Sequence, residues 1–167
     1  MSGNLRAENA PDVHVDGTGR RVAIVCSRFN DLVVDRLVSG ARRALVDHGV
    51  ADDAIRTFRV PGALEIPQVA SAIAASGHYD AIVALGAVIR GDTYHFEVVS
   101  DASADGLMRL SLESHDPRVV ITNGILTVDT AEQAMVRAED GDGNKGAQAA
   151  LAALETLAVI DSIDSIG

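Results

Sequence analysis

The sequence predicts an α/β protein, a three-layer sandwich with a parallel sheet flanked by helices on both faces. Short apolar runs alternate along the chain with longer segments whose apolar residues recur at helical spacing. The order is β-α-β-α-β-α-β-α-α, and alternation at this spacing is typical of parallel sheets. The chain has 167 residues, 47% of them hydrophobic, which is enough for one domain with a full core.

The chain begins with a polar segment, and residues 1–20 are predicted to form a flexible N-terminal arm. Val13 and Val15 alternate with polar neighbours there, so a short added edge strand is the alternative. Residues 21–167 contain no internal repeat and no linker, and we expect them to form a single domain.

Two strands and one helix are predicted next. Arg21 to Cys26 is an apolar strand, and a helix then runs to about His48, where Gly49 ends it. A second strand covers about Ile55–Val60, and the turn at Pro61-Gly62-Ala63 follows it.

The middle of the chain continues the alternation of helices and strands. Pro67 lies in the first turn of a helix, where proline is tolerated, and Gly77 ends that helix. Ala81 to Leu85 is a continuous apolar run typical of a strand buried on both faces, and Gly86 is predicted to end it. Helical spacing resumes over residues 94–114.

The last strand is predicted at Val119–Thr122, followed by a turn at Asn123-Gly124. A short helix follows, with capping-box spacing from Thr130. An acidic loop at Glu139–Gly143 separates it from the final helix, Lys145 to about Ile163.

Composition excludes several classes of function. The 14 Lys and Arg against 24 Asp and Glu give a net charge of −10 with no basic patch, which argues against nucleic acid as a partner. No His, Cys, Asp or Glu cluster has metal-ligand spacing, and no dinucleotide or Walker motif is present. Cys26 is the single cysteine, and a small buried core residue is a more probable role for it than a nucleophile.

The location predicted for this chain is the cytoplasm. No apolar run approaches the roughly 20 residues of a membrane span. Residues 1–20 also lack the apolar segment of a signal peptide.

The junction at residues 81–97 is the strongest candidate site. A buried strand ends and a helix begins there, and the connection carries a guanidinium, a hydroxyl and an imidazole. Ligands bind at the carboxyl ends of parallel strands, and the free N–H groups at a helix start attract anions. We therefore predict a phosphate site at Gly91–Thr93 and proton transfer by His95, a hypothesis that gains weight from Arg90 beside them.

Four strand ends should meet at this edge of the sheet: Ser27–Asp31, Pro61–Glu65, Gly86–His95 and Asn123–Thr127. Phe29 is an aromatic residue in a polar loop, where it either stacks on a heterocycle or anchors the loop against the domain. Glu65 either faces a ligand or stabilises a helix start. Arg137 is predicted on a helix at the far side of the fourth strand end and Lys145 near a helix start, although single cations are most often solvated.

Five motifs occur together in one order. They are Ser27-Arg28-Phe29-Asn30-Asp31, Val60-Pro61-Gly62-Ala63-Leu64-Glu65-Ile66-Pro67, Leu85-Gly86-Ala87-Val88-Ile89-Arg90-Gly91-Asp92-Thr93-Tyr94-His95-Phe96, Asn123-Gly124-Ile125-Leu126-Thr127 and Asn144-Lys145-Gly146. In this order and at these intervals they resemble the 6,7-dimethyl-8-ribityllumazine synthase family of riboflavin biosynthesis over roughly residues 20–160.

The resemblance implies a flavodoxin-like fold with a four-stranded parallel sheet and no cofactor or metal. It also implies an enzyme, a transferase that condenses 5-amino-6-(D-ribitylamino)uracil with 3,4-dihydroxy-2-butanone 4-phosphate and releases phosphate and water. By motif, His95 would transfer protons. The pyrimidine and its ribityl chain would contact Phe29, Ala63, Leu64, Glu65, Ala87, Val88, Ile89 and Asn123. The phosphate would contact Asp92, Thr93 and Arg137, with Arg90 and Lys145 as further candidates.

Two positions depart from the family pattern that the resemblance implies. Asp92 places a carboxylate at the phosphate turn, so we predict that its backbone N–H binds the phosphate while its side chain points away. Asn123 stands where other members carry an aromatic residue, which removes an apolar wall but keeps hydrogen-bonding groups.

The resemblance further implies a homopentamer in which Asn123 and Arg137 enter the site of a neighbouring subunit. An icosahedral shell of pentamers and a decamer are alternative assemblies. A non-catalytic protein that binds flavin or lumazine, or that only forms a shell, is the alternative to the enzyme. Retention of His95, Arg137 and Lys145 together favours the enzyme.

Overall fold

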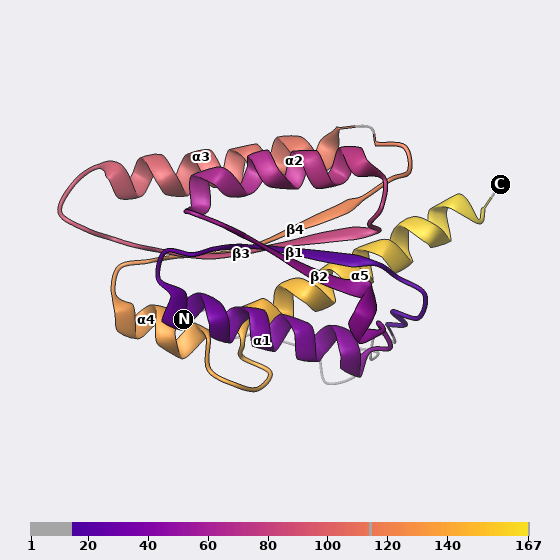
Figure 1. Ribbon diagram of the computed structural model, residues 1–167, viewed down its shortest axis with the longest axis horizontal. Helices are drawn as coiled ribbons and strands as arrows, with labels where there is room; N and C mark the ends of the chain where they lie inside the picture. Colours follow the sequence, from indigo (N-terminus) through magenta and orange to yellow (C-terminus); the bar gives the residue numbers. More distant parts are fainter. Residues whose placement is uncertain (1–14, 114, 167) are drawn as a thin grey trace.

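The computed structural model describes residues 15–113 and 115–166, and it has a four-stranded parallel sheet between two helical layers (Figure 1). The strand order is β2-β1-β3-β4, and every neighbouring pair is parallel. This arrangement confirms the predicted flavodoxin-like α/β sandwich. The strands are β1 (Val22–Ser27), β2 (Ile55–Val60), β3 (Ala81–Ile89) and β4 (Val120–Val128). The helices are α1 (Asp31–Asp47), α2 (Ile66–Ser76), α3 (His95–Leu112), α4 (Ala131–Arg137) and α5 (Lys145–Asp164), with 3₁₀ turns at Asp52–Ala54 and Ala63–Glu65.

The two faces of the sheet bury different side chains of the same strand. α2 and α3 cover one face, where Ala23 and Val25 of β1 join their apolar side chains (Figure 1). α1, α4 and α5 cover the other face, where Ile24 and Cys26 are buried. Because both faces are covered, the strand is apolar throughout. Cys26 is therefore a core residue, and burial raises the pKa of its thiol, which keeps the thiol protonated.

Local sequence signals set the helix boundaries as predicted. Gly49 (φ 94°) and Gly77 (φ 68°) adopt the left-handed conformation just past the ends of α1 and α2. At the start of α4, the Thr130 hydroxyl accepts a hydrogen bond from the backbone N–H of Gln133. The Gln133 side chain in turn accepts one from the N–H of Asp129.

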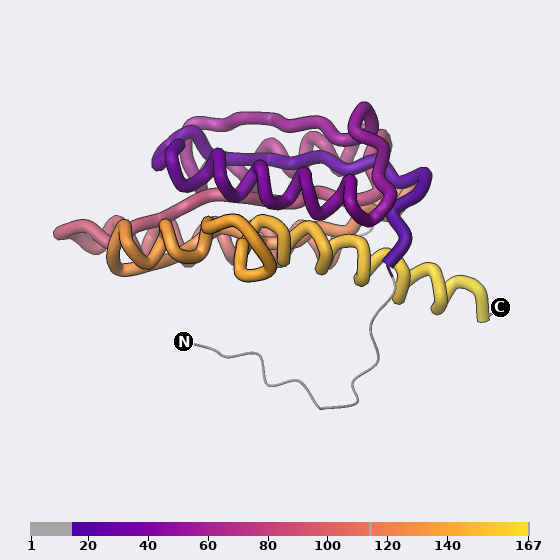
Figure 2. Tube along the Cα trace, turned by 90° about the horizontal axis from the view of Figure 1, so that it is seen from below, coloured from indigo at the N-terminus to yellow at the C-terminus, as the bar shows by residue number. Residues whose placement is uncertain are grey.

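α1 and α5 lie side by side under the sheet and approach each other closely (Figure 2). A β-carbon on Gly146 would overlap the carbonyl oxygen of Leu37, so only glycine fits this crossing. Asn144 is fully buried beside it, where its Nδ2 donates to the Ala138 carbonyl oxygen at 3.0 Å and its Oδ1 accepts from Ala147 N. The start of α5 is thus fixed by backbone contact and by a satisfied polar side chain.

Two strand boundaries were predicted wrongly. β3 continues through Gly86 to Ile89, and β4 continues through Asn123 and Gly124 to Val128. Gly86 makes room for neighbours, because a β-carbon there would lie 3.0 Å from Ser27 Oγ. A β-carbon on Gly124 would lie 2.6 Å from Leu85 Cδ2. Both glycines therefore allow close packing within strands and do not form turns.

The sheet ends in a step at its carboxyl edge. β1 ends at Ser27, and its last pairing to β3 joins Cys26 with Leu85. β3 and β4 stay paired for four more residues, as far as Ile89 and Val128. On the side that β1 has vacated, the final residues of β3 have no neighbouring strand.

The terminal segments complete the described structure. Val15 is buried in the core beside α1, while residues 1–14, which hold most of the predicted arm, lie outside the described residues. α5 extends beyond the sheet at its far end (Figures 1 and 2). By length and composition it is the one described helix able to cross a membrane. Its inner face packs on α1 and β4, which is the pattern of a core helix.

Candidate active site

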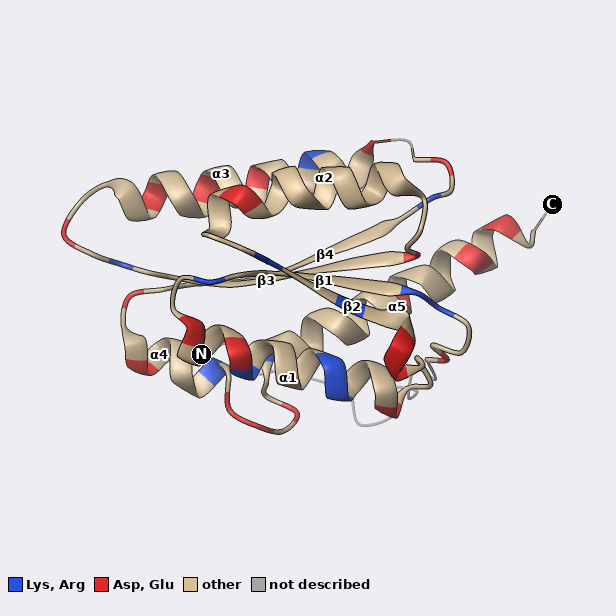
Figure 3. Ribbon diagram, in the orientation of Figure 1, with Lys and Arg blue, Asp and Glu red and all other residues tan. Residues whose placement is uncertain are grey.

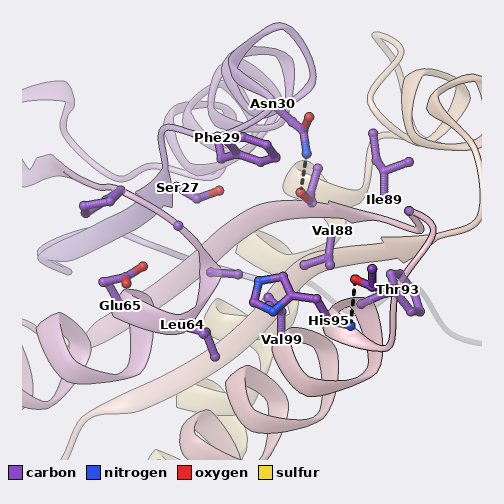
Figure 4. A pocket seen from close by; sticks show the side chains of 16 residues that line it. Ser27, Phe29, Asn30, Leu64, Glu65, Val88, Ile89, Thr93, His95 and Val99 are labelled. Carbon is purple, nitrogen blue, oxygen red and sulfur yellow. Dashed lines mark hydrogen bonds between the residues drawn. The ribbon is translucent and has the colours of Figure 1, made fainter.

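A cavity with a volume of about 460 Å³ lies on the step of the sheet. It opens where β1 and β2 end and where β3 continues alone on that side (Figure 4). Its lining residues are Ser27, Phe29, Asn30, Pro61, Gly62, Ala63, Leu64, Glu65, Ala87, Val88, Ile89, Gly91, Thr93, His95, Phe96 and Val99. Nine residues of the predicted site are among them: Phe29, Ala63, Leu64, Glu65, Ala87, Val88, Ile89, Thr93 and His95.

The turn after β1 presents an aromatic ring to this cavity. Phe29 is 72% exposed, so it does not pack against the domain as a loop anchor would. Its backbone N–H donates to the Pro61 carbonyl oxygen at 3.2 Å, which joins the first two strand ends. An exposed ring on a hydrogen-bonded turn is a ready stacking surface.

Asn30 fixes this turn, and the sequence analysis did not select it. Its backbone has φ 62° and ψ 45°, a left-handed conformation that asparagine tolerates better than most residues. Its Nδ2 donates to the Ala87 carbonyl oxygen at 2.8 Å (Figure 4). Asn30 therefore links the start of α1 to the unpaired edge of β3. The aromatic–Asn–Asp order before a helix was the signal that could have identified it.

Glu65 stands at the start of α2 without capping it, and its side chain lines the cavity. The Glu65 carboxylate lies over Gly62, three residues earlier in the chain. A β-carbon on Gly62 would be 3.1 Å from Glu65 Oε2. Both roles predicted for Glu65 fit this position, because the residue stands at the start of α2 and also lines the cavity. Below it, Ala63 is buried and Leu64 is partly exposed at the cavity wall.

Ser27 and two residues of α3 complete the lining that sequence analysis did not select. Ser27 is 1% exposed, and no hydrogen-bond partner satisfies its hydroxyl. Phe96 and Val99 form part of the wall, one helical turn into α3.

His95 is the first residue of α3 and lies in the wall opposite the turn that carries Phe29. Its backbone N–H approaches Thr93 Oγ1 at 3.4 Å, and its ring points into the cavity (Figure 4). His95 is exposed, so its imidazole can contact a ligand. Gly91 and Thr93 line the cavity on either side of Asp92.

Arg90 follows β3 and binds protein groups instead of facing the cavity. Its Nε donates to Asp129 Oδ1 at 2.8 Å, and its Nη1 binds Glu97 Oε1. Its guanidinium also lies 4.2 Å from the centre of the Phe96 ring. The hydrogen bonds that Arg90 donates to Asp129 and Glu97 raise the pKa of Arg90, and the bond donated by Arg90 lowers the pKa of Glu97.

Besides Arg90 and Asp92, three further predicted residues are outside the cavity lining. Asn123 is in the middle of β4, where its Oδ1 accepts from the Ile125 N–H at 2.9 Å. The expectation that it follows a strand end was therefore wrong. Arg137 donates to the Gln133 carbonyl oxygen at 3.0 Å, and Lys145 donates to Gln148 Oε1 at 2.8 Å.

The distribution of charged and metal-binding side chains limits the chemistry that the site can perform. Acidic residues are spread over both helical layers and the connecting loops, with basic residues scattered among them (Figure 3). Within residues 15–113 and 115–166, no group of three His, Cys, Asp or Glu side chains could hold a metal ion. The cavity's own residues offer an aromatic surface, backbone groups, a carboxylate and an imidazole.

Fold and cavity together define an α/β protein with a cavity at the carboxyl edge of its sheet, the place where proteins of this class bind small molecules. The family model described as 6,7-dimethyl-8-ribityllumazine synthase matches residues 19–161. A protein of that name from Xylella fastidiosa (strain 9a5c) is 49% identical over 130 residues, which cover 78% of this chain and 82% of the relative. One from Deinococcus deserti is 45% identical over 141 residues, covering 84% of this chain and 88% of the relative. The chain belongs to the 6,7-dimethyl-8-ribityllumazine synthase family.

Proposed function

We propose that this protein is an enzyme, a transferase of riboflavin biosynthesis that makes 6,7-dimethyl-8-ribityllumazine. It would condense 5-amino-6-(D-ribitylamino)uracil with 3,4-dihydroxy-2-butanone 4-phosphate and release phosphate and water. The family and the names of the relatives support this activity. The structural observation that supports this activity is a single cavity lined by both the exposed Phe29 ring and the His95 imidazole.

The pyrimidine ring would lie against Phe29 and along the end of β3. Beyond Leu85, β3 lacks a neighbouring strand on the β1 side. Backbone groups of Ala87 and Ile89 point to that side, where the Ala87 carbonyl oxygen accepts from Asn30 Nδ2, and Val88, whose backbone groups face β4, lines the cavity between them. A pyrimidine edge carries amide N–H and C=O groups of the same kind, and it would take the place of a strand on the β1 side.

The ribityl chain would extend toward the start of α2. Glu65 offers carboxylate oxygens that accept hydrogen bonds from hydroxyl groups, while Ala63 and Leu64 supply an apolar wall. A polyol has donors at every carbon, so one carboxylate beside an apolar surface suits it.

The phosphate would bind at the turn between β3 and α3. The backbone N–H groups of Asp92 and Thr93 lie in the turn just before α3, whose N-terminal end favours an anion. The cavity's own lining contains no arginine or lysine, so Arg137 would have to come from a neighbouring subunit. Lys145 is a further candidate for the same role.

Asn123, exposed on an outer strand of the sheet, would likewise serve the neighbour's pyrimidine. Homopentamers would supply these contacts, and an icosahedral shell of pentamers remains the larger alternative. We also propose that residues 21–167 act as one domain, which the packing of α5 on α1 supports. The cytoplasm is the proposed location, and the single buried cysteine fits a reducing compartment.

His95 would move protons during the reaction. Imine formation, loss of phosphate and ring closure each require a proton to be taken up or released. A histidine titrates close to neutral pH and can act in both directions. Holding two substrates together in one cavity would supply much of the remaining rate.

The test is a two-substrate assay with the His95→Ala variant. The parent should form the lumazine chromophore, and His95→Ala should lower kcat by about 100-fold to 10,000-fold with little change in pyrimidine affinity. His78→Ala is the matched control, because His78 is an exposed histidine outside the cavity lining. A His95→Ala protein as fast as the parent would remove the proposed role.

The alternative is a protein of the same fold that binds flavin or lumazine without turnover. The exposed Phe29 ring suits stacking in either case. Such a protein would bind the lumazine tightly and form no product from the two substrates.

A further inference from the structure

Arg90 connects three segments that meet beside the cavity. Its backbone N–H donates to the Val128 carbonyl oxygen at 2.9 Å, so it continues the pairing of β3 with β4. Its side chain then binds Asp129, the residue after β4, at 2.8 Å. The same guanidinium binds Glu97 and lies over the ring of Phe96, and both of these residues belong to the first turn of α3.

These contacts connect the residue before the turn 91–94 to the residues that follow it. Arg90 precedes the turn, and Phe96 and Glu97 follow it just inside α3. Among the described residues, the turn takes part in two long hydrogen bonds, both at its α3 end: His95 N–H to Thr93 Oγ1 at 3.4 Å and Val98 N–H to the Tyr94 carbonyl oxygen at 3.3 Å. The conformation of the turn therefore depends more on the guanidinium than on its own hydrogen bonds.

We propose that Arg90 is a positioning residue that acts through His95 and the turn 91–94. It holds the first turn of α3 against the ends of β3 and β4, and this fixes where the imidazole and the N–H groups of Asp92 and Thr93 point. The inference rests on the proposed function, since it concerns the proton transfer and phosphate binding assigned there.

Electrostatics argues against Arg90 as a direct phosphate ligand. Two carboxylates, Asp129 and Glu97, already surround the guanidinium, so the group as a whole carries a negative charge. Those carboxylates would repel an incoming phosphate dianion. The planar guanidinium suits a positioning role instead, because its N–H groups reach the carboxylates of Asp129 and Glu97 while its face lies on the Phe96 ring.

The test is Arg90→Lys, which keeps the charge but cannot bind both carboxylates and cover Phe96 together. We expect kcat to fall about 10-fold to 100-fold, as for a misplacement of reacting groups on the order of 1 Å. Pyrimidine affinity, measured by calorimetry, should stay within about twofold, because the surfaces at Phe29 and Glu65 are unchanged. Arg109→Lys is the matched control, since Arg109 pairs with Asp105 at 2.6 Å on the same helix and away from the cavity.

Two further measurements separate positioning from other effects. Glu97→Gln should lower kcat less than Arg90→Lys, and the double variant should be no slower than Arg90→Lys alone if both act through one contact. Amide hydrogen exchange of residues 91–95 should be faster in Arg90→Lys than in Arg109→Lys, whether or not the protein turns over substrate.

The outcomes distinguish the two proposals. A parent protein that makes no product would overturn the proposed function, and unchanged exchange in residues 91–95 would overturn the positioning role independently. An Arg90→Lys protein with the parent's kcat would also overturn it, as would a loss of pyrimidine affinity equal to the loss of kcat.

Discussion

At the scale of single residues, the site depends on where each backbone group is placed. Asn30 adopts a left-handed conformation and reaches Ala87, and together they set the turn that presents Phe29. Residue type, position and the family resemblance together selected Phe29, Glu65, Thr93 and His95, which line one cavity, and their roles there stay predictions. These signals did not identify Asn30 or Ser27, whose importance depends on a φ angle and on the absence of a hydrogen-bond partner.

Asp92 provides a prediction at this scale. It lies between two residues that line the cavity, and the proposed phosphate contact uses its N–H. Asp92→Asn keeps that N–H and removes a nearby negative charge, so KM for the phosphorylated substrate should fall roughly twofold to fivefold with kcat unchanged.

Steady-state kinetics at low ionic strength measures this effect, and added salt should reduce it. Asp101→Asn is the control, because Asp101 is an exposed carboxylate further along α3. A rise in KM on Asp92→Asn would indicate that the carboxylate itself assists the substrate.

At the scale of elements, sequence periodicity located every strand and helix but misjudged two strand ends. Gly86 and the Asn123-Gly124 pair are the usual residues of turns, and they were predicted as such. In the fold they lie inside strands, where Gly86 faces Ser27 and Gly124 faces Leu85. A local pattern cannot show that a glycine makes room for a side chain that is distant in sequence. The two strands were therefore predicted too short, and the step in the sheet was not predicted.

The attachment of α3 to β3 should weaken in acid. The hydrogen bond from Arg90 lowers the pKa of Glu97, so the folded protein holds this carboxylate ionised more strongly than the unfolded chain does. The pair therefore stabilises the fold above the ordinary glutamate pKa of roughly 4.3. That contribution is lost as the pH falls through the lower pKa of the folded state.

Chemical denaturation of the parent and of Glu97→Gln measures this effect. The parent should be the more stable at pH 7, and the difference should vanish once the pH lies below both pKa values. Glu155→Gln, at an exposed carboxylate on α5, should show no comparable change with pH. A difference that persists in acid would mean that the Glu97 side chain stabilises α3 by packing and not by charge.

At the scale of the whole molecule, the contact of α1 with α5 joins the beginning of the chain to its end. Gly146 and the buried Asn144 allow that contact, and a β-carbon at position 146 would overlap the Leu37 backbone. Gly146→Ala should therefore lower the free energy of unfolding by about 1–3 kcal/mol, since the helices must move apart.

Urea denaturation measures the change, and Gly143→Ala is a matched control. A β-carbon on Gly143 has no neighbour within 4 Å, and its backbone is not left-handed. That control should keep the stability of the parent, and equal effects of the two variants would argue against a close helix contact.

The proposed sharing of sites between subunits predicts complementation. His95→Ala and Arg137→Ala proteins should each be nearly inactive alone. Because each site would draw His95 from one subunit and Arg137 from its neighbour, an equal mixture assembled together should recover about a quarter of the parent activity.

The control is a mixture of two different inactive His95 variants, which should recover nothing. Activity of the mixed assembly no higher than that of the separate variants would show that each site is built from one chain.

The positions of Arg137 and Lys145 outside their own subunit's cavity have one more consequence. If the cations that neutralise the phosphate come from another copy, a separated subunit holds the pyrimidine platform and the imidazole but lacks counter-charge. The rate per subunit would then depend on dilution, falling once the protein is too scarce for neighbours to meet. Riboflavin output in a cell would respond to the abundance of this chain more steeply than in simple proportion, with a threshold set by subunit affinity.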